Sequence, residues 1–184
     1  TRETDDVCHD LRSPSNFHAA LLALDTRTIE EHRAMRCPAC AGPLCRSDYP
    51  RKAWGVDARA RLLYARRFSL CCTREGCRVR VTPRSARFLG RRRYPAFWVV
   101  LISILSQQAR PQHCRRICER IGLSERTLTR WRQWWREWFG QSPFWRVWRS
   151  RFLPVPTVLP RDLLGAFGAA GTRGRLLQML DWLG

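Results

Sequence analysis

Apolar residues in the first part of the chain recur at helical spacing. Over residues 17–33 they stand three to five positions apart. This spacing predicts an amphipathic helix with four core positions, Phe17, Leu21, Leu24 and Ile29. Residues 1–16 are mostly polar, and we expect them to form a loose leader.

Alternation at a period of two follows farther along the chain. Val79 and Val81 alternate with Arg78, Arg80 and Thr82, which is typical of a short strand with one buried face. Pro83 lacks a backbone N–H and is expected to end this strand.

The second half of the chain reads as a series of helices. The run Phe97–Leu105 is almost wholly apolar and follows Pro95, a residue favoured at the start of a helix, so it predicts a buried helix ending near Ala109. The run is about half as long as a membrane-spanning helix, so we expect no membrane association. Shorter periodic segments predict further helices at 112–121, 125–139, 161–168 and 173–183.

A tight turn is predicted between the helices at 112–121 and 125–139. Gly122 permits the sharp change of direction, Leu123 is apolar and points into the core, and Ser124 is suited to cap the next helix. Ile117 and Ile121 are the expected buried positions of the first helix. This pattern predicts a helix-turn-helix.

The helix at 125–139 is predicted to have two unlike faces. One face is apolar and carries Leu128, Trp131, Trp135 and Trp138, whereas the opposite face carries Arg126, Arg130, Gln133 and Glu137, flanked by Thr129 and Arg136. An apolar face on a scaffold and a face of long hydrogen-bond donors are what a DNA recognition helix needs. The expected contacts to nucleic acid are Ser124, Arg126, Thr129, Arg130 and Gln133. The alternative is an ordinary amphipathic helix with a solvated face.

Tryptophan is concentrated around this helix. Six tryptophans fall within eighteen residues, at 131, 134, 135, 138, 145 and 148. Their helical spacing favours core packing or a protein-partner interface over base stacking. Trp134 lies off the main apolar face and is the position expected to be exposed.

Nine cysteines suggest a metal site. Cys37 and Cys40 are separated by two residues, and Cys72 and Cys77 by four, with Gly76 helping the chain to turn back. Two such pairs supply four thiolates, the closed set of a structural Zn²⁺ site, and a short strand follows as in a zinc ribbon. Cys71 could replace Cys72 as a ligand, and ordinary buried thiols are the alternative to a metal site.

The remaining cysteines and the histidines are assigned no ligand role. Cys45 is a spare thiol, and Cys114 and Cys118 are expected to pack in the core at their spacing of four. The histidines, His9, His18, His32 and His113, show no ligand spacing. The knuckle-like spacing favours a reducing compartment over a disulfide framework, and no secretory signal is visible.

Charge is strongly uneven along the chain. The net charge is +19, and residues 51–110 hold fifteen basic and two acidic residues. All basic residues except Lys52 are arginine, which suits phosphates and guanine edges, although a GC-rich genome would give the same bias. A block this basic is typical of a protein that binds a polyanion. Arg91, Arg92 and Arg93, on a tether before the helix that Pro95 opens, are expected phosphate contacts.

Together these modules resemble a known architecture. A cysteine ribbon, a strand ending in Thr-Pro, an apolar helix and a helix-turn-helix are similar to the N-terminal half of zinc-ribbon insertion-sequence transposases. The resemblance spans roughly residues 35–139. It is carried by Cys37-Pro-Ala-Cys40, Cys72 with Gly76-Cys77-Arg78, Val81-Thr82-Pro83 and the stretch from Gly122 to Trp131. Such transposases continue into a ribonuclease-H-like domain with three metal-binding carboxylates, but only Asp162 and Asp181 follow Glu137 here.

The expected fold is mainly α, with a small zinc-ribbon β element and a helix-turn-helix domain. We expect four parts: a leader and short helix (1–34), a zinc ribbon with a basic connector (35–94), the helix-turn-helix domain (95–152) and a short helical tail (153–184). A cytoplasmic, nucleoid-associated, non-enzymatic protein is expected, a sequence-specific DNA-binding accessory or targeting protein of a mobile element. The alternative is an RNA-binding or ribonucleoprotein assembly subunit that recognises shape and phosphates, with the tryptophan-rich region docking on protein.

Overall fold

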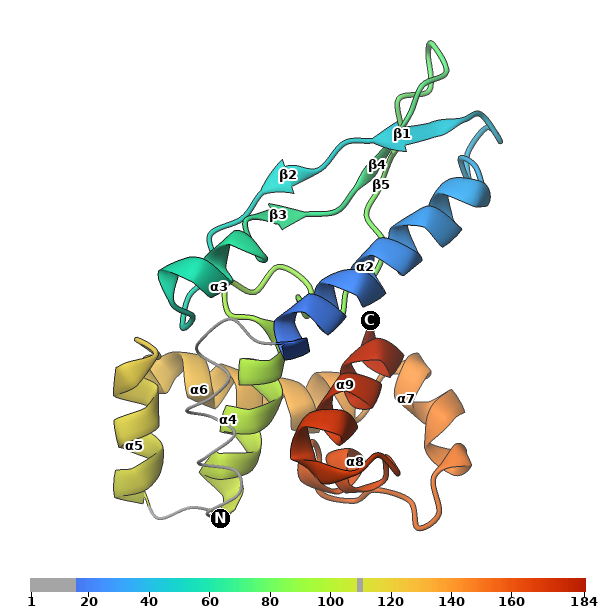
Figure 1. The fold of residues 1–184 in the computed structure, drawn as a ribbon. Helices are drawn as coiled ribbons and strands as arrows, with labels where there is room; N and C mark the ends of the chain where they lie inside the picture. Colours follow the sequence, from blue (N-terminus) through green and yellow to red (C-terminus); the bar gives the residue numbers. More distant parts are fainter. Residues whose placement is uncertain (1–15, 109–110) are drawn as a thin grey trace.

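The computed structural model describes residues 16–108 and 111–184. These residues form an elongated arm that stands on a body of helices (Figure 1). The expected leader, with His9, falls outside the described residues except for Asn16, as does the expected helix end at Ala109.

The arm consists of one long helix and a narrow ribbon of strands beside it (Figure 1). The helix is α2 (Asn16–Ala34). The ribbon contains β1 (Leu44–Arg46), β2 (Tyr49–Pro50), β3 (Arg66–Arg67), β4 (Leu70–Cys72) and β5 (Arg80–Val81). A short helix, α3 (Ala58–Leu62), lies between β2 and β3. The predicted helix at 17–33 is confirmed, and the predicted strand at 78–82 is present but shortened to two residues.

All strand pairs are antiparallel. Strand β4 lies between β1 and β5, with Leu44 opposite Cys72 and Cys71 opposite Arg80, while β2 pairs with β3. After the first cysteine pair, the chain runs along β1 and β2 toward the body, and it returns along β3 and β4 toward the second pair (Figure 1). This return brings the two cysteine pairs to the far end of the arm.

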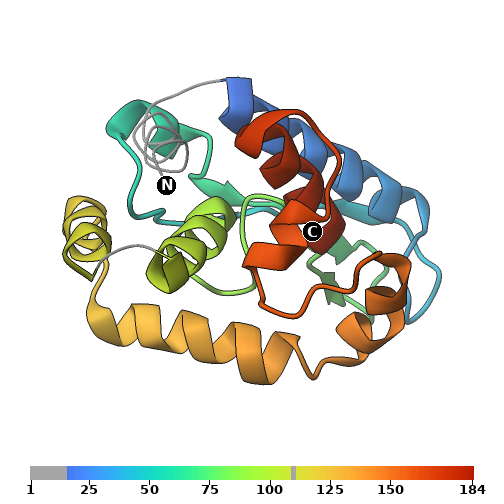
Figure 2. The same cartoon turned by 90° about the horizontal axis from the view of Figure 1, so that it is seen from below.

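The body is built around α4 (Ala96–Gln108), which contacts α5, α6 and α9. Around it lie α5 (Pro111–Arg120), α6 (Glu125–Gln133), α7 (Pro143–Trp148), the 3₁₀ turn η2 (Arg149–Arg151), α8 (Arg161–Gly165) and α9 (Gly171–Leu183). Helix α6 continues without a break into a π-helix, η1 (Trp134–Phe139), and Figure 2 shows the two as one rod along an edge of the body. All helices predicted in the second half are therefore present.

Buried apolar side chains of the described residues form a main core and a smaller one. The main core fills the body, where every residue from Ala96 to Leu105 is buried. A smaller core in the arm contains Ile29, Leu44 and Leu70 together with cysteines. Helix α2 belongs to both, because Phe17 and Leu21 pack in the main core. No helix in the described ranges is long and apolar enough to cross a bilayer.

The π-helix changes which aromatic residues are buried. Trp131 and Trp135 are buried as predicted, but Trp138 is 71% exposed and Phe139 takes the buried position. A π-helix has more residues per turn than an α-helix, so the face that continues from Trp135 reaches Phe139. The prediction that Trp138 belongs to the apolar face is therefore wrong. Trp134, expected to be exposed, is half-buried and packs against the core.

Candidate metal centre and candidate nucleic-acid interface

Four cysteines converge at the end of the arm. The sulfur atoms of Cys37, Cys40, Cys72 and Cys77 all lie within 4.8 Å of one another. The sulfur atoms of Cys40 and Cys72 are 3.5 Å apart, and those of Cys37 and Cys77 are 3.7 Å apart. Four sulfur atoms so close together can surround one metal ion, so the sequence prediction of these four residues is confirmed as a candidate metal site.

Local backbone geometry brings each pair together. The turn that carries Cys37 and Cys40 is closed by a hydrogen bond from the Cys37 N–H to the Gly42 carbonyl at 3.0 Å. Gly42 is packed so closely that a Cβ there would lie 3.2 Å from the Cys40 sulfur and 3.3 Å from that of Cys72. In the second pair, Gly76 adopts a φ of +79° and turns the chain back toward Cys77.

Strand alternation decides between Cys71 and Cys72. Successive side chains of a strand point to opposite faces, and Cys72 is buried on the face that carries the small core whereas Cys71 is not. Cys45 faces Cys71 across the ribbon, and its thiol donates to the Cys71 carbonyl. The cluster therefore includes Cys72, and Cys45 and Cys71 lie outside it.

The four thiols have unlike environments. A hydrogen bond from the Gly42 backbone lowers the pKa of Cys40 to about 7, whereas burial raises the pKa of the Cys72 thiol. The backbone N–H of Arg74 points at the Cys72 sulfur at 3.4 Å, and the Arg74 guanidinium donates to the Cys40 carbonyl. A thiolate set here would have the backbone donors of Gly42 and Arg74 and the Arg74 guanidinium beside it.

Among the described residues, the cysteines and histidines that were given no ligand role lie outside the thiol cluster. Cys114 and Cys118 are buried in the main core, as expected. His18 is buried in the core, where its Nδ1 lies 2.7 Å from the Tyr64 hydroxyl. His32 has its Nδ1 2.9 Å from the Thr28 carbonyl on α2. Neither histidine is part of the thiol cluster.

A second candidate site is a hollow of about 620 Å³ in the body, beside the N-terminal end of α6. The arginine tether lines one side of it, and α6 with the turn before it lines the other. The lining residues are Trp54, Arg91, Arg92, Arg93, Tyr94, Gly122, Ser124, Thr127, Arg130 and Trp131. Two groups of predicted site residues, more than thirty positions apart in the sequence, therefore meet in space.

The turn before α6 has the predicted geometry. Gly122 adopts a φ of +67°, Leu123 is buried, and the Ser124 hydroxyl caps the helix by accepting from the Thr127 N–H. The Tyr94 hydroxyl donates to the Gly122 carbonyl and ties the turn to the start of α4. The turn is thus held by the Ser124 cap at the start of α6 and by the Tyr94 hydrogen bond next to α4.

The predicted recognition residues lie on the exposed face of α6. Arg126, Thr129, Arg130 and Gln133 are exposed, while Leu128 and Trp131 are buried beneath them. The Thr129 hydroxyl donates to the Glu125 carbonyl at 3.0 Å, and the Gln133 amide donates to Glu137 at 2.7 Å. Arg126 and Arg130 supply exposed cations on this face.

The tether is less uniform than its sequence. Arg91 and Arg93 are exposed, with the Arg93 guanidinium 5.2 Å from the centre of the Trp54 ring. Arg92 is half-buried over Trp134 at 4.3 Å, it donates to the Leu89 carbonyl, and burial lowers its pKa. Sequence reasoning missed Trp54, since a single tryptophan in a loop carries no periodic signal.

Searches against protein-family models, curated proteins and solved structures found no match for this chain.

Proposed function

We propose that this protein binds nucleic acid, most directly duplex DNA, and that α6 is the recognition helix of a helix-turn-helix formed with α5. The observation that carries this proposal is the hollow in which Arg91, Arg92 and Arg93 meet Ser124 and Arg130. Docking into a major groove requires cations that bind the DNA phosphates, placed beside the exposed face of a helix.

Each part of this surface suits one kind of contact. Arg91 and Arg93 are exposed cations that fit phosphates, which position a protein on a duplex without reading its sequence. Arg126 and Arg130 are exposed in the N-terminal half of the rod formed by α6 and η1, where they would reach base edges. An arginine can bind a guanine through two hydrogen bonds. Gln133 offers the corresponding pair to adenine once its bond to Glu137 is exchanged, and Thr129 lies beside it.

We propose a structural role for the thiol cluster. Four thiolates in a closed tetrahedral set are the donors that zinc takes in structural sites. One Zn²⁺ at Cys37, Cys40, Cys72 and Cys77 would stabilise the end of the arm, whose own apolar core is small. No catalytic step is proposed for it.

The biological setting proposed is that of a mobile element. The resemblance to the N-terminal half of zinc-ribbon transposases favours a DNA-binding accessory or targeting protein that acts in the cytoplasm on nucleoid DNA. A second candidate is an RNA-binding or ribonucleoprotein subunit. The exposed Trp138 and Val147 favour it, since a partner protein could cover them.

Selection of bound duplexes from a random pool tests the proposal. Wild-type protein should enrich a motif, and Arg130→Ala should relax preference at one or two positions, because each bidentate contact contributes about 1–3 kcal/mol of discrimination. Arg146→Ala, an exposed arginine on α7, is the matched control and should leave the motif unchanged. If no motif is enriched, or if structured RNA binds more tightly than any duplex, the second candidate replaces the first.

A further inference from the structure

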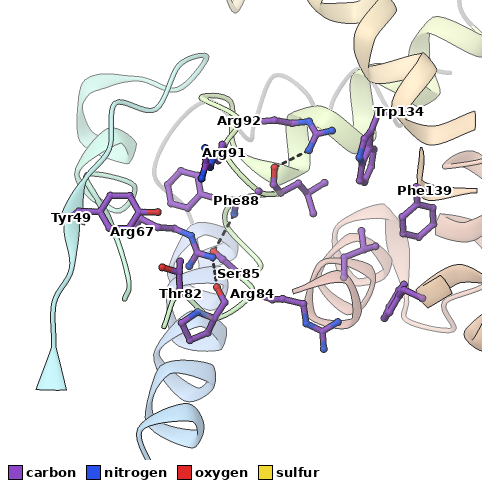
Figure 3. Close-up of a pocket in the computed structure, with 15 residues that line it drawn as sticks. Tyr49, Arg67, Thr82, Arg84, Ser85, Phe88, Arg91, Arg92, Trp134 and Phe139 are labelled. Carbon is purple, nitrogen blue, oxygen red and sulfur yellow. Dashed lines mark hydrogen bonds between the residues drawn. The ribbon is translucent and has the colours of Figure 1, made fainter. Parts of the chain in front are cut away.

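A second cavity lies on the other side of Arg91 and Arg92. It has a volume of about 640 Å³ and lies between the arm, the segment that leads to α4, and the helices of the body. Figure 3 shows Tyr49, Arg67 and Phe88 along one side and Trp134 and Phe139 along the other. Its volume falls within the range of about 300–1,000 Å³ that is usual for small-molecule sites.

The lining is strongly cationic. Arg67, Arg84, Arg91 and Arg92 line the cavity, and none of the described residues that line it has an acidic side chain. Within residues 16–108 and 111–184, none of these four arginines forms an ion pair with an acidic side chain. Positive charge gathered in a hollow without acidic partners favours an anionic ligand.

Two of these cations are already held in place. The guanidinium of Arg67 is buried and donates to the carbonyls of Pro83 and Phe68, and Arg92 donates to the carbonyl of Leu89. Burial lowers the pKa of both side chains. A phosphate that approached them would meet donors whose orientation is fixed before binding, so little side-chain entropy would be lost.

The cavity is also rich in flat rings. Five aromatic side chains of the described residues line it, and two of them lie under an arginine that also lines the cavity: Arg92 lies 4.3 Å from the centre of Trp134, and Arg84 lies 5.6 Å from that of Phe144. Guanidinium planes and aromatic faces are the surfaces on which unpaired bases stack. A ligand with both a flat ring and an anionic group fits this lining better than either group alone.

We propose that this cavity binds a nucleoside phosphate, with the base stacked among the rings and the phosphate on the arginines. The nucleotide could belong to an unpaired strand or be free, and the chemistry of recognition is the same. The inference rests in part on the proposed function, because Arg91 and Arg92 border both this cavity and the hollow beside α6. An unpaired nucleotide here would lie next to a duplex docked on α6.

Calorimetric titration of the full chain with adenosine monophosphate, adenosine and inorganic phosphate tests this site. The monophosphate should bind at least about tenfold more tightly than either part, since it alone engages the rings and the cations, and one charge-assisted hydrogen bond has about that effect. If inorganic phosphate binds as tightly as the monophosphate, the cavity recognises only an anion. If adenosine binds as tightly as the monophosphate, the arginines do not contribute to binding. Either result overturns the proposal.

The critical variant is Arg84→Ala, because Arg84 is exposed and lies outside the hollow beside α6. It should weaken binding of the monophosphate about tenfold without shifting the melting temperature, and Arg146→Ala should weaken nothing. Unchanged affinity in Arg84→Ala overturns the proposal. Tighter binding of a single-stranded oligonucleotide than of the monophosphate assigns the ligand to a strand, and the reverse assigns it to a free nucleotide.

Arg126→Ala separates this site from the proposed duplex interface. It should lower duplex affinity and leave the monophosphate affinity unchanged. If wild-type protein shows no duplex preference but still binds the monophosphate through Arg84, the proposed function fails and the cavity assignment stands.

Discussion

Asp25 of α2 and Arg87, on the segment that leads to α4, form an ion pair with a nitrogen–oxygen distance of 2.7 Å, although their side chains are only 1% and 2% exposed. The carboxylate also accepts from the Ser85 hydroxyl and from the Ala86 backbone N–H. The same guanidinium donates to the Leu63 carbonyl and lies over the Phe68 ring. This pair fastens the arm to the chain that carries the arginine tether.

Breaking this pair should destabilise the protein severely. Asp25→Asn leaves a buried guanidinium without its counter-ion, and the free energy of unfolding should fall by about 3–5 kcal/mol. Denaturant titration followed by circular dichroism measures this loss. Asp181→Asn is the matched control, because it breaks an exposed pair of the same 2.7 Å length with Arg27, and it should cost less than about 1 kcal/mol. Similar losses in both variants would contradict the buried role of Asp25.

The metal proposal predicts different outcomes for two neighbouring cysteines. Cys72→Ser should release the metal, since its sulfur is one of the four in the cluster, whereas Cys71→Ser should retain it, since that side chain points to the other face. Elemental analysis of the purified variants measures metal content, and wild-type protein should hold about one zinc ion.

A chelator gives the second arm of this test. Stripping the ion from wild-type protein should lower its melting temperature, because structural zinc binding contributes directly to folding. Metal that persists in Cys72→Ser, or a melting temperature that the chelator does not alter, would rule out the assigned ligand set.

The nucleic-acid proposal predicts a steep dependence of affinity on salt. The logarithm of the affinity should fall linearly with that of the salt concentration, by about 0.9 for each phosphate neutralised. Arg93→Ala should make the slope shallower by about 1 and weaken all sequences alike, as expected for a phosphate contact. Fluorescence anisotropy between 50 and 200 mM salt, about the range in which such binders lose orders of magnitude, measures the slope. A flat response would exclude phosphate-driven binding.

The π-helix reverses the stability effects that the apolar pattern predicts for two adjacent residues. Phe139→Ala should cost about 3–5 kcal/mol because it empties a packed position, whereas Trp138→Ala should change stability by no more than about 0.5 kcal/mol. Paired denaturant titrations of the two variants decide the register. A larger loss in Trp138→Ala would mean that the rod continues as a regular α-helix.

The sequence predicts the parts of this fold that depend on local signals. Periodic apolar residues and favourable end residues, such as Ser124, locate the helices, and the spacing of the cysteines identifies all four members of the thiol cluster. Packing between distant segments carries no such signal. The burial of Arg92 depends on its stacking on Trp134, the ion pair of Asp25 spans 62 positions, and the basic cavity is assembled from the arm and the body together.

The membership of α2 in both hydrophobic cores has a thermodynamic consequence. A helix of 19 residues that is anchored at one end by Phe17 and Leu21 and at the other by Ile29 cannot fray at one end without loosening packing at the other. Cooperative unfolding units of this kind are visible in amide hydrogen exchange. Binding of a metal ion to the thiol cluster at the tip of the arm should therefore slow the hydrogen exchange of amides near Leu21, which packs in the main core. The two cores should open as a single unit.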